Sequence, residues 1–546
     1  MRHINRGIKV AALGAVGVLA LSACGSSSSS SSGAAGGAFS MAIEAPQGGL
    51  NPTNCYDLYC AQVDQAMFTG LFQFNTTDGK MVPAPSSLTK SVTASNAGKT
   101  YTIEINPGYK FTNGEAVTAK TFVDTFNFTA NGGNGQQLGF IFGPTQLNVT
   151  GYKAVEAASS KTGTMSGLKA TGENTLEFNL DTPLIESLFE NFLAGPQVYP
   201  IPSSGIKDIE AYNKNVIGNG PYKLQGTWDN AKGGTLVKNA DYPGTAGKAD
   251  TINMKIYASD DAMWADLQAN TLDVTANLTQ NALSTAPQVL GNRFINDEGG
   301  LQYSYYGFPA SDPAFKEKGV RVAIAKSINT DEINQKLYYG TRQAGTSFAP
   351  STINGGGTDI CGDNCKFDAA AAKSMLQAAG GFKGTGVHIS QLANETGDVQ
   401  KALCNQIQAN LAIKCVVDIY KDFGTMLDDQ QKGKVPPGTL VGSGWVADNP
   451  TIQNMVTASF TTGNQNNIVG YANPQFDKLL QEGTQSTDDA TQISKWQEAE
   501  KILLQNDFPA WPFQFRNQVG GYSTKVSNVS INPGGFVDLA TITVNQ

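Results

Sequence analysis

The stretch GSGWVADNP, residues 442–450, holds side chains suited to binding a charged solute. Its small residues let the backbone approach a ligand closely, Trp445 offers a flat amphipathic surface, and Asp448 offers a carboxylate. An enclosed ammonium group needs such a counter-charge, because a buried charge is tolerated only when it is paired. Asn449 is a further candidate contact. The structural alternative is that Asp448 caps a helix beginning near Thr451.

Little in the sequence indicates a catalytic function. His388 lies in an alternating GVHIS run, where it is more simply a strand residue, and a Ser-His-Asp arrangement would have to use it. The chain has no G-x-S-x-G elbow, no G-x-G-x-x-G fingerprint and no P-loop. Ser87-Leu-Thr-Lys90 and Lys161-Thr-Gly163 mimic two of the three signatures of penicillin-binding enzymes, but no S-x-N lies between them. We therefore predict neither an enzyme nor a cofactor.

The N-terminus has the three-part form of a secretory signal: a basic start, the apolar run VAALGAVGVLAL and a small-residue exit. LSAC resembles the bacterial lipobox, which implies cleavage after residues 1–23 and lipid attachment to Cys24. Serines with Gly and Ala then predict a flexible tether over residues 24–38. The alternative is a secreted product in which the cysteine is incidental.

Composition narrows the class of protein further. The formal net charge is −8, so the chain lacks the excess of basic residues that is typical of a nucleic-acid-binding protein. Beyond the tether no apolar run approaches membrane-spanning length, so the lipid would be the only membrane attachment. About 500 residues remain, enough for several domains.

Seven cysteines become six once Cys24 is lipidated. An export signal places them in an oxidising compartment, where disulfides are the default. Many pairings are open to six cysteines, but sequence proximity favours neighbours. A zinc site is the less favoured reading, because companion histidines are missing, and we predict no metal. The favoured pairs are Cys55 with Cys60, Cys361 with Cys365, and Cys404 with Cys415.

The elements that must position these residues alternate between strands and helices. Alternation in YTIEI predicts a strand near residue 101, and Thr118 is a predicted N-cap for the helix that follows. Strands are predicted at TLEFNL, INMKIY, GVHIS and KCVVDIY, and helices at DDAMWADLQAN, VRVAIAKSIN, DAAAAKSMLQAAGG, DVQKALCNQIQANLA and SKWQEAEKILLQN. This order predicts an α/β architecture.

Several of these stretches together resemble a known family. LNP at 50–52, YTIEINPGYKFTNGEAVTAKTF, IGNGPYKL, LQANTLDVTANL, GVRVAIAKSINTDEI, FDAAAAKSMLQAAG and the segment from WVADNP to NPQFDKLL resemble, in the same order, the dipeptide- and oligopeptide-binding lipoproteins of ABC importers, solute-binding family 5. The resemblance implies a two-lobed periplasmic-binding-protein-like α/β fold of type II with an extra inserted domain. Lobe I would combine 39–80, 195–302 and 506–546, the inserted domain would span 81–194, and lobe II would span 303–505.

The resemblance also implies a function and partners. The chain would be a monomer that captures peptides on the outer face of the cytoplasmic membrane and delivers them to permease subunits driven by separate ATPases. The same fold binding another solute, such as an oligosaccharide, and an exterior ligand sensor remain open.

The resemblance implies roles for particular residues. In the family the aspartate matching Asp448 anchors the α-amino group of the ligand. The loop NCYDLYC, with Tyr56, would face the ligand, stiffened by a disulfide from Cys55 to Cys60. Tyr303 and Tyr305 share one strand face and would either line the cleft or pack in the core.

The chain also departs from the family pattern. The common Gly-Thr-Gly-Pro-Tyr reads Gly-Asn-Gly-Pro-Tyr here, a change at Asn219 that we interpret as structural. Asp-Tyr-Pro-Asp-Pro becomes Asp448-Asn-Pro-Thr-Ile, which leaves the substrate class open.

Overall fold

A computed structural model describes residues 36–257, 259–393 and 396–545. The predicted signal sequence, the lipidation site Cys24 and all but the last three residues of the predicted tether lie outside these ranges. Within the described ranges no helix is both long enough and apolar enough to cross a membrane.

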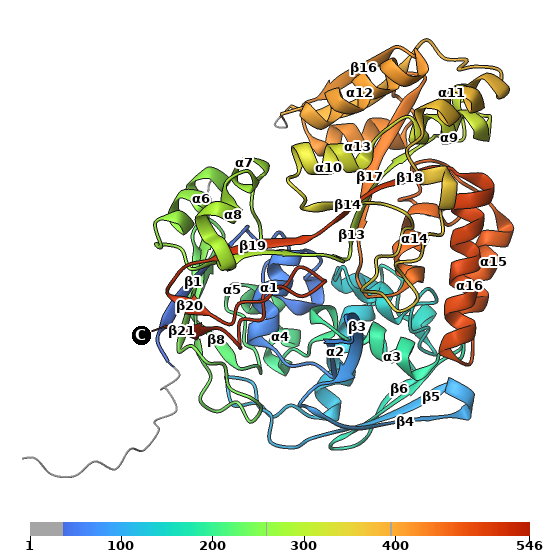
Figure 1. The fold of residues 1–546 in the computed structure, drawn as a ribbon. Helices are drawn as coiled ribbons and strands as arrows, with labels where there is room; N and C mark the ends of the chain where they lie inside the picture. Colours follow the sequence, from blue (N-terminus) through green and yellow to red (C-terminus); the bar gives the residue numbers. More distant parts are fainter. Residues whose placement is uncertain (1–35, 258, 394–395, 546) are drawn as a thin grey trace, which may run out of the picture. The chain divides into compact units, whose positions relative to one another are not determined.

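The first sheet has seven strands and is mixed (Figure 1). The N-terminal strand runs parallel to its neighbour, with Ala38 opposite Thr251, and the hairpin at the far edge is antiparallel. Five of the six residues of the N-terminal strand are buried, as expected for a strand covered on both faces. The strands in spatial order are β12 (Phe294–Asp297), β19 (Gln518–Tyr522), β11 (Val274–Thr275), β1 (Ala38–Ile43), β10 (Thr251–Ile256), β9 (Gly233–Lys238) and β8 (Tyr222–Asp229).

The second sheet has six strands and is also mixed. Its central strand pairs antiparallel with both neighbours, whereas the last three strands run parallel to one another. In spatial order the strands are β14 (Arg342–Ala344), β18 (Ala510–Arg516), β13 (Gln302–Gly307), β17 (Thr439–Val446), β15 (Val387–Leu392) and β16 (Cys415–Tyr420).

A four-stranded antiparallel sheet and two hairpins complete the strands. In the predicted YTIEI strand, Tyr101, Ile103 and Ile105 are buried, and the residues between them are only partly buried. The antiparallel order is β4 (Thr89–Ser95), β5 (Thr100–Ile105), β7 (Thr175–Asn179) and β6 (Leu168–Gly172); the two-stranded pairs are β2 (Phe72–Thr77) with β3 (Lys80–Pro85), and β20 (Val526–Ser527) with β21 (Thr543–Val544).

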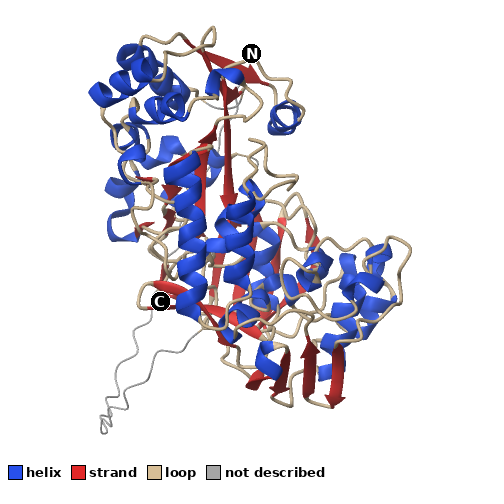
Figure 2. Cartoon of the chain, turned by 90° about the vertical axis from the view of Figure 1, so that its right-hand side faces the viewer, coloured by secondary structure: helices blue, strands red, loops and turns tan. Residues whose placement is uncertain are grey.

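Helices lie alongside these sheets, as the mixed α/β prediction requires (Figure 2). Thr118 is the N-cap of α2 as predicted, and its N–H donates to the hydroxyl of Thr121 at 3.0 Å. The helices are α1 (Leu58–Met67), α2 (Ala119–Ala130), α3 (Glu186–Phe192), α4 (Ser203–Lys207), α5 (Ile209–Lys214), α6 (Asp260–Gln268), α7 (Gln280–Leu283), α8 (Ala286–Leu290), α9 (Lys318–Lys326), α10 (Thr330–Leu337), α11 (Ala369–Ala378), α12 (Asp398–Leu411), α13 (Phe423–Gln431), α14 (Ile452–Phe460), α15 (Pro474–Thr484) and α16 (Asp489–Lys501).

The predicted helices and strands are confirmed, with one difference. SKWQEAEKILLQN begins as α-helix in α16 but ends as a π-helical stretch, Ile502–Asp507, before Phe508 with a positive φ of 53°. The three predicted disulfides, Cys55–Cys60, Cys361–Cys365 and Cys404–Cys415, are present.

The chain passes twice from one sheet to the other. The first passage leaves β12 at Asp297 and enters β13 at Gln302, and the second leaves β18 at Arg516 and enters β19 at Gln518 (Figure 1). Because both passages are short, they place the ends of the two sheets next to each other. The candidate site lies at these passages.

Glu500 is a buried acid in α16 whose charged form the fold disfavours. Its side chain is 1% exposed and accepts a hydrogen bond from the backbone N–H of Phe348. Burial raises the pKa of Glu500 from 4.5 to about 7, so the folded chain keeps a proton that the unfolded chain has released. The contribution of this proton to the free energy of unfolding is fully present below about pH 4.5 and is lost as the pH rises through about 7.

Glu500→Gln removes this titration, so the variant is expected to lose less stability than the wild type between about pH 5 and about pH 8. The difference in the free energy of unfolding should reach about 2–3 kcal/mol. Thermal unfolding followed by circular dichroism at both pH values measures it. Glu498→Gln, an exposed acid of the same helix, is the matched control. Equal pH dependence in Glu500→Gln and wild type would contradict the assignment.

Candidate ligand-binding site

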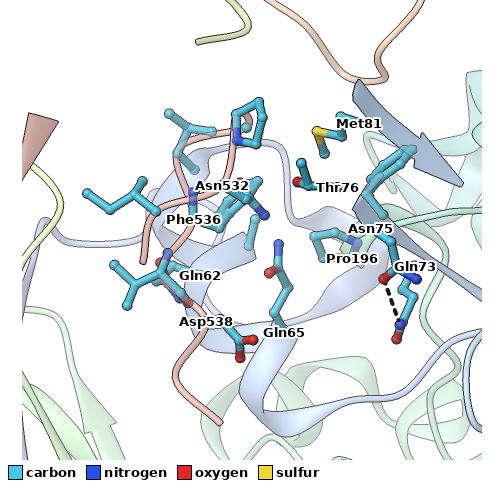
Figure 3. Close-up of a pocket in the computed structure, with 18 of the residues that line it drawn as sticks. Gln62, Gln65, Gln73, Asn75, Thr76, Met81, Pro196, Asn532, Phe536 and Asp538 are labelled. Carbon is cyan, nitrogen blue, oxygen red and sulfur yellow. Dashed lines mark hydrogen bonds between the residues drawn. The ribbon is translucent and has the colours of Figure 1, made fainter. Parts of the chain in front are cut away.

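A cavity of ≈ 1040 Å³ lies beside the two passages. This volume lies just above the range of about 300–1,000 Å³ found for sites that enclose small molecules. Figure 3 shows polar side chains of several elements pointing toward its centre. The lining comes from α1 and the loop before it, the hairpin of β2 and β3, residues 195–199, residues 297–301, residues 446–449 and the C-terminal loop at residues 530–540.

Helix α1 presents one face to the cavity. Its N-cap is Asp57, whose carboxylate accepts from the N–H groups of Tyr59 and Cys60, both at 2.9 Å. The Cys55–Cys60 disulfide closes the loop around this cap, and it leaves the Tyr56 side chain 53% exposed at the cavity. A loop held in this way loses less conformational freedom when a ligand binds.

The hairpin of β2 and β3 forms a second, polar wall. Asp78 and Gly79 turn the chain with φ angles of 49° and 72°, the left-handed pair that a two-residue type I′ turn requires. On the strands, the Gln73 amide donates to the side-chain oxygen Oδ1 of Asn75 at 3.0 Å, and Thr76 lies next to them at the cavity (Figure 3). The wall therefore offers amide and hydroxyl groups to a ligand.

Asn219 holds the segment after α1 in place from behind. It is fully buried, its carbonyl oxygen accepts from the Thr69 N–H at 3.0 Å, and its amide donates to the Thr69 carbonyl at 2.9 Å. Thr69 and Gly70 line the cavity. The glycines beside Asn219 are also required, because a Cβ on Gly220 would lie 2.5 Å from the backbone of Met67. Asn219 therefore supports the backbone of Thr69 from the protein interior, as the structural interpretation of this position predicts.

Gln62 ties the C-terminal loop to α1. Its amide donates to the carbonyl of Val537 at 3.0 Å, and its carbonyl oxygen accepts from the Val537 N–H at 2.8 Å. Because Gln62 satisfies both backbone groups of Val537, the loop that carries Phe536 and Asp538 is fixed against the cavity (Figure 3). Nothing in the local sequence at residues 530–540 signals this role.

Asp448 follows β17 at the cavity wall. Its carboxylate accepts from the side-chain amide N–H of Asn454 at 3.3 Å, and its backbone N–H donates to the side-chain oxygen Oδ1 of Asn454 at 3.0 Å. The same oxygen accepts from the indole N–H of Trp445 at 3.2 Å. The Asp448 side chain is open to the cavity but enclosed by protein on its other sides, and this enclosure raises its pKa.

The helix that follows is capped by another residue. Thr451 is the N-cap of α14, and its hydroxyl accepts from the Asn454 N–H at 3.1 Å. The structure therefore contradicts the alternative in which Asp448 is the helix cap. The carboxylate keeps an unused oxygen and faces the cavity.

The predicted binding residues separate into two groups. Tyr56, Asp448 and Asn449 line the cavity, although the side-chain oxygen Oδ1 of Asn449 already accepts from the Thr451 hydroxyl at 2.8 Å. Trp445 does not belong to the lining; it is partly buried beside Asp448.

Tyr303 and Tyr305 belong to the core. Each is 1% exposed, and their rings lie 5.0 and 6.3 Å from that of Phe348. The hydroxyl of Tyr303 donates to the carbonyl of Met455 at 2.7 Å. The two rings share one strand face as predicted, but that face packs against the core instead of lining the cavity.

Sequence reasoning missed several lining residues. Gln62 and Gln65 stand on the cavity face of α1. The only sequence signal for this placement was their spacing of three residues, which puts two side chains on one face of a helix. His388, by contrast, lies away from the cavity as the strand prediction expects, with its ring nitrogen 2.8 Å from the carboxylate of Asp418 on the parallel neighbour β16.

Comparison with known proteins gives a consistent result. The model of the bacterial extracellular solute-binding proteins, family 5, matches residues 83–467. The chain is 26% identical over 479 residues to the dipeptide-binding protein DppE of Bacillus subtilis, covering 84% of this chain and 83% of that protein. It is 24% identical over 481 residues to the oligopeptide-binding protein OppA of the same organism, covering 85% of each.

Solved structures show the same fold. The substrate-binding protein CtaP of Listeria monocytogenes superimposes with a TM-score of 0.79 at 19% identity, over 94% of this chain and 100% of that chain. The murein tripeptide binding protein MppA of Escherichia coli gives a TM-score of 0.75 at 19% identity, over 94% and 99%. The predicted fold class is confirmed.

Proposed function

Because the chain belongs to the bacterial extracellular solute-binding proteins of family 5, which are non-catalytic, we propose that it captures di- or oligopeptides outside the cell for an ABC importer. The observation that carries this proposal is the Asp448 carboxylate, which is open to the cavity, held by Asn454 and free of any ion pair with the described residues. A free α-ammonium is the complementary group.

The rest of the cavity wall suits a peptide backbone. Amides of Gln65, Gln73, Asn75 and Asn532 line it, whereas the amide of Gln62 is engaged with Val537 (Figure 3). Each amide can donate and accept, so together with water they can satisfy peptide N–H and C=O groups regardless of the side chains. Peptide-binding relatives support the same class of ligand.

The proposal includes an arrangement in the cell. Lipid on Cys24 would hold the chain at the outer face of the membrane, and the tether would let it reach the permease. The lobes and the inserted domain would follow the boundaries given above, and the two passages between the sheets would act as the hinge on which the lobes close.

Mass spectrometry of the solute released by denaturing the purified protein tests the proposal. We expect peptides with free amino termini. The control is the Asp448→Asn variant purified in parallel, which should release less of them. An oligosaccharide or another non-peptide solute in stoichiometric amount would contradict the proposal.

A further inference from the structure

The charged residues that line the cavity all have the same sign. They are five acids, Asp57, Asp297, Glu298, Asp448 and Asp538. No lysine, arginine or histidine belongs to the lining formed by the described part of the chain. A cleft lined by one sign of charge focuses the electric field and raises the local concentration of oppositely charged ligands.

Four of the five carboxylates are available to a ligand. Asp57 is the exception, because one of its oxygens accepts from the backbone N–H groups of Tyr59 and Cys60 at the start of α1, and the other accepts from that of Gln47. The other four are exposed and form no ion pair within 4.0 Å with any described residue. Asp538 accepts from backbone N–H groups of its own loop, including that of Ala540 at 3.2 Å. Charge is thus left unneutralised at the wall.

The four carboxylates come from three segments that meet at one wall. The N–H of Ala447 donates to the carbonyl of Leu301 at 2.9 Å, and the N–H of Leu301 donates to the carbonyl of Pro533 at 2.8 Å. These bonds join the segment of Asp448 to the segment of Asp297 and Glu298, and that segment to the C-terminal loop of Asp538. One bound ligand can therefore face carboxylates from all three segments.

The lysine that lies between two lining residues in the sequence is already engaged elsewhere. Lys80, between the lining residues Gly79 and Met81, donates to the carbonyls of Ser351 and Ile353. Among the described residues, therefore, no free lysine lines this wall to meet a carboxylate on the ligand.

The arginines of the second sheet are also outside the lining. Arg342 and Arg516 stand opposite each other on β14 and β18. Arg516 donates to the side-chain oxygen Oδ1 of Asn277 at 2.6 Å, and Arg342 lies over the ring of Tyr338 at 5.0 Å. Neither forms an ion pair within 4.0 Å with a described carboxylate of the cavity.

We propose that the preferred ligand of this cavity carries a net positive charge, as a peptide with lysine or arginine side chains does. This inference rests on the proposed peptide function and adds a charge class to it. Asp448 pairs with the α-ammonium, and Asp297, Glu298 and Asp538 attract the second cation. An acidic peptide brings a further negative charge to a wall that has nothing to pair with it.

Calorimetry with three matched tripeptides tests the proposal on the wild-type protein. Ala-Lys-Ala should bind about tenfold more tightly than Ala-Ala-Ala, and Ala-Glu-Ala about tenfold less tightly. Added salt should compress both differences, because it screens exposed charges. The series needs no variant, so it remains decisive if a substitution impairs folding.

A triple variant locates the effect. In Asp297→Asn/Glu298→Gln/Asp538→Asn, the preference for Ala-Lys-Ala over Ala-Ala-Ala should fall to about one. The control removes the same charge from exposed acids elsewhere, as Glu210→Gln/Asp260→Asn/Asp261→Asn, and should keep the wild-type preference.

The possible outcomes separate the two proposals. Ala-Glu-Ala binding as tightly as Ala-Lys-Ala overturns the charge preference while the peptide function stands. A preference that survives in the triple variant overturns the assignment to these acids. Binding of none of the three peptides overturns the proposed function and this inference with it.

Discussion

Replacing Asp448 by asparagine is expected to weaken the binding of a tripeptide with a free amino terminus by a few hundred- to a few thousandfold. The variant keeps the shape of the side chain and its contact with Asn454 but removes the counter-charge. An enclosed ammonium that loses its partner costs about 3–5 kcal/mol, which corresponds to this range of affinity. Calorimetric titration of wild type and variant with Ala-Ala-Ala measures the change.

Two controls accompany this titration. N-acetylated Ala-Ala-Ala has no ammonium, so Asp448→Asn should change its affinity little. Asp331→Asn removes an exposed carboxylate at the start of α10, away from the cavity, and should leave the affinity of the free peptide at the wild-type value. A loss of less than about threefold in Asp448→Asn would show that Asp448 does not hold the ligand.

Replacing Asn219 by alanine is expected to lower the free energy of unfolding by about 2–5 kcal/mol. The substitution leaves the N–H and the C=O of Thr69 buried without partners, and each unsatisfied group costs about 1–3 kcal/mol. Urea denaturation of both proteins measures the loss. Because Thr69 and Gly70 line the cavity, the affinity for a peptide should fall as well.

Asn466→Ala is the matched control for this substitution. Its side chain is exposed, so the loss should stay within about 0.5 kcal/mol. Asn219→Asp is an informative second variant, since a carboxylate still accepts from the Thr69 N–H but cannot donate to its carbonyl. If Asn219→Ala unfolds at the wild-type urea concentration, the paired hydrogen bonds do not support this part of the cavity.

The sequence predicts those elements whose signals are local. The alternation of YTIEI and the threonine before the following helix suffice to predict β5 and α2, because burial in β5 and capping in α2 depend on residues close in the chain. The π-helical end of the segment after α16 was missed, since its residues keep good helical propensity and the change depends on packing.

The candidate site is harder to predict, because its walls come from segments far apart in the chain. Gln62 and Val537 are bonded across 475 residues, and no pattern near either of them indicates the other. Tyr303 and Tyr305 illustrate a second limit. Alternation predicts that they share a face, but β13 is a central strand between β17 and β18, and alternation does not tell which face meets the cavity.

A crystal structure of the protein with Ala-Lys-Ala bound tests the central claim most directly. We expect the peptide inside the ≈ 1040 Å³ cavity, with its α-ammonium about 2.7–2.9 Å from a carboxylate oxygen of Asp448. A peptide bound outside this cavity, or bound inside it with the ammonium turned away from Asp448, would contradict the account.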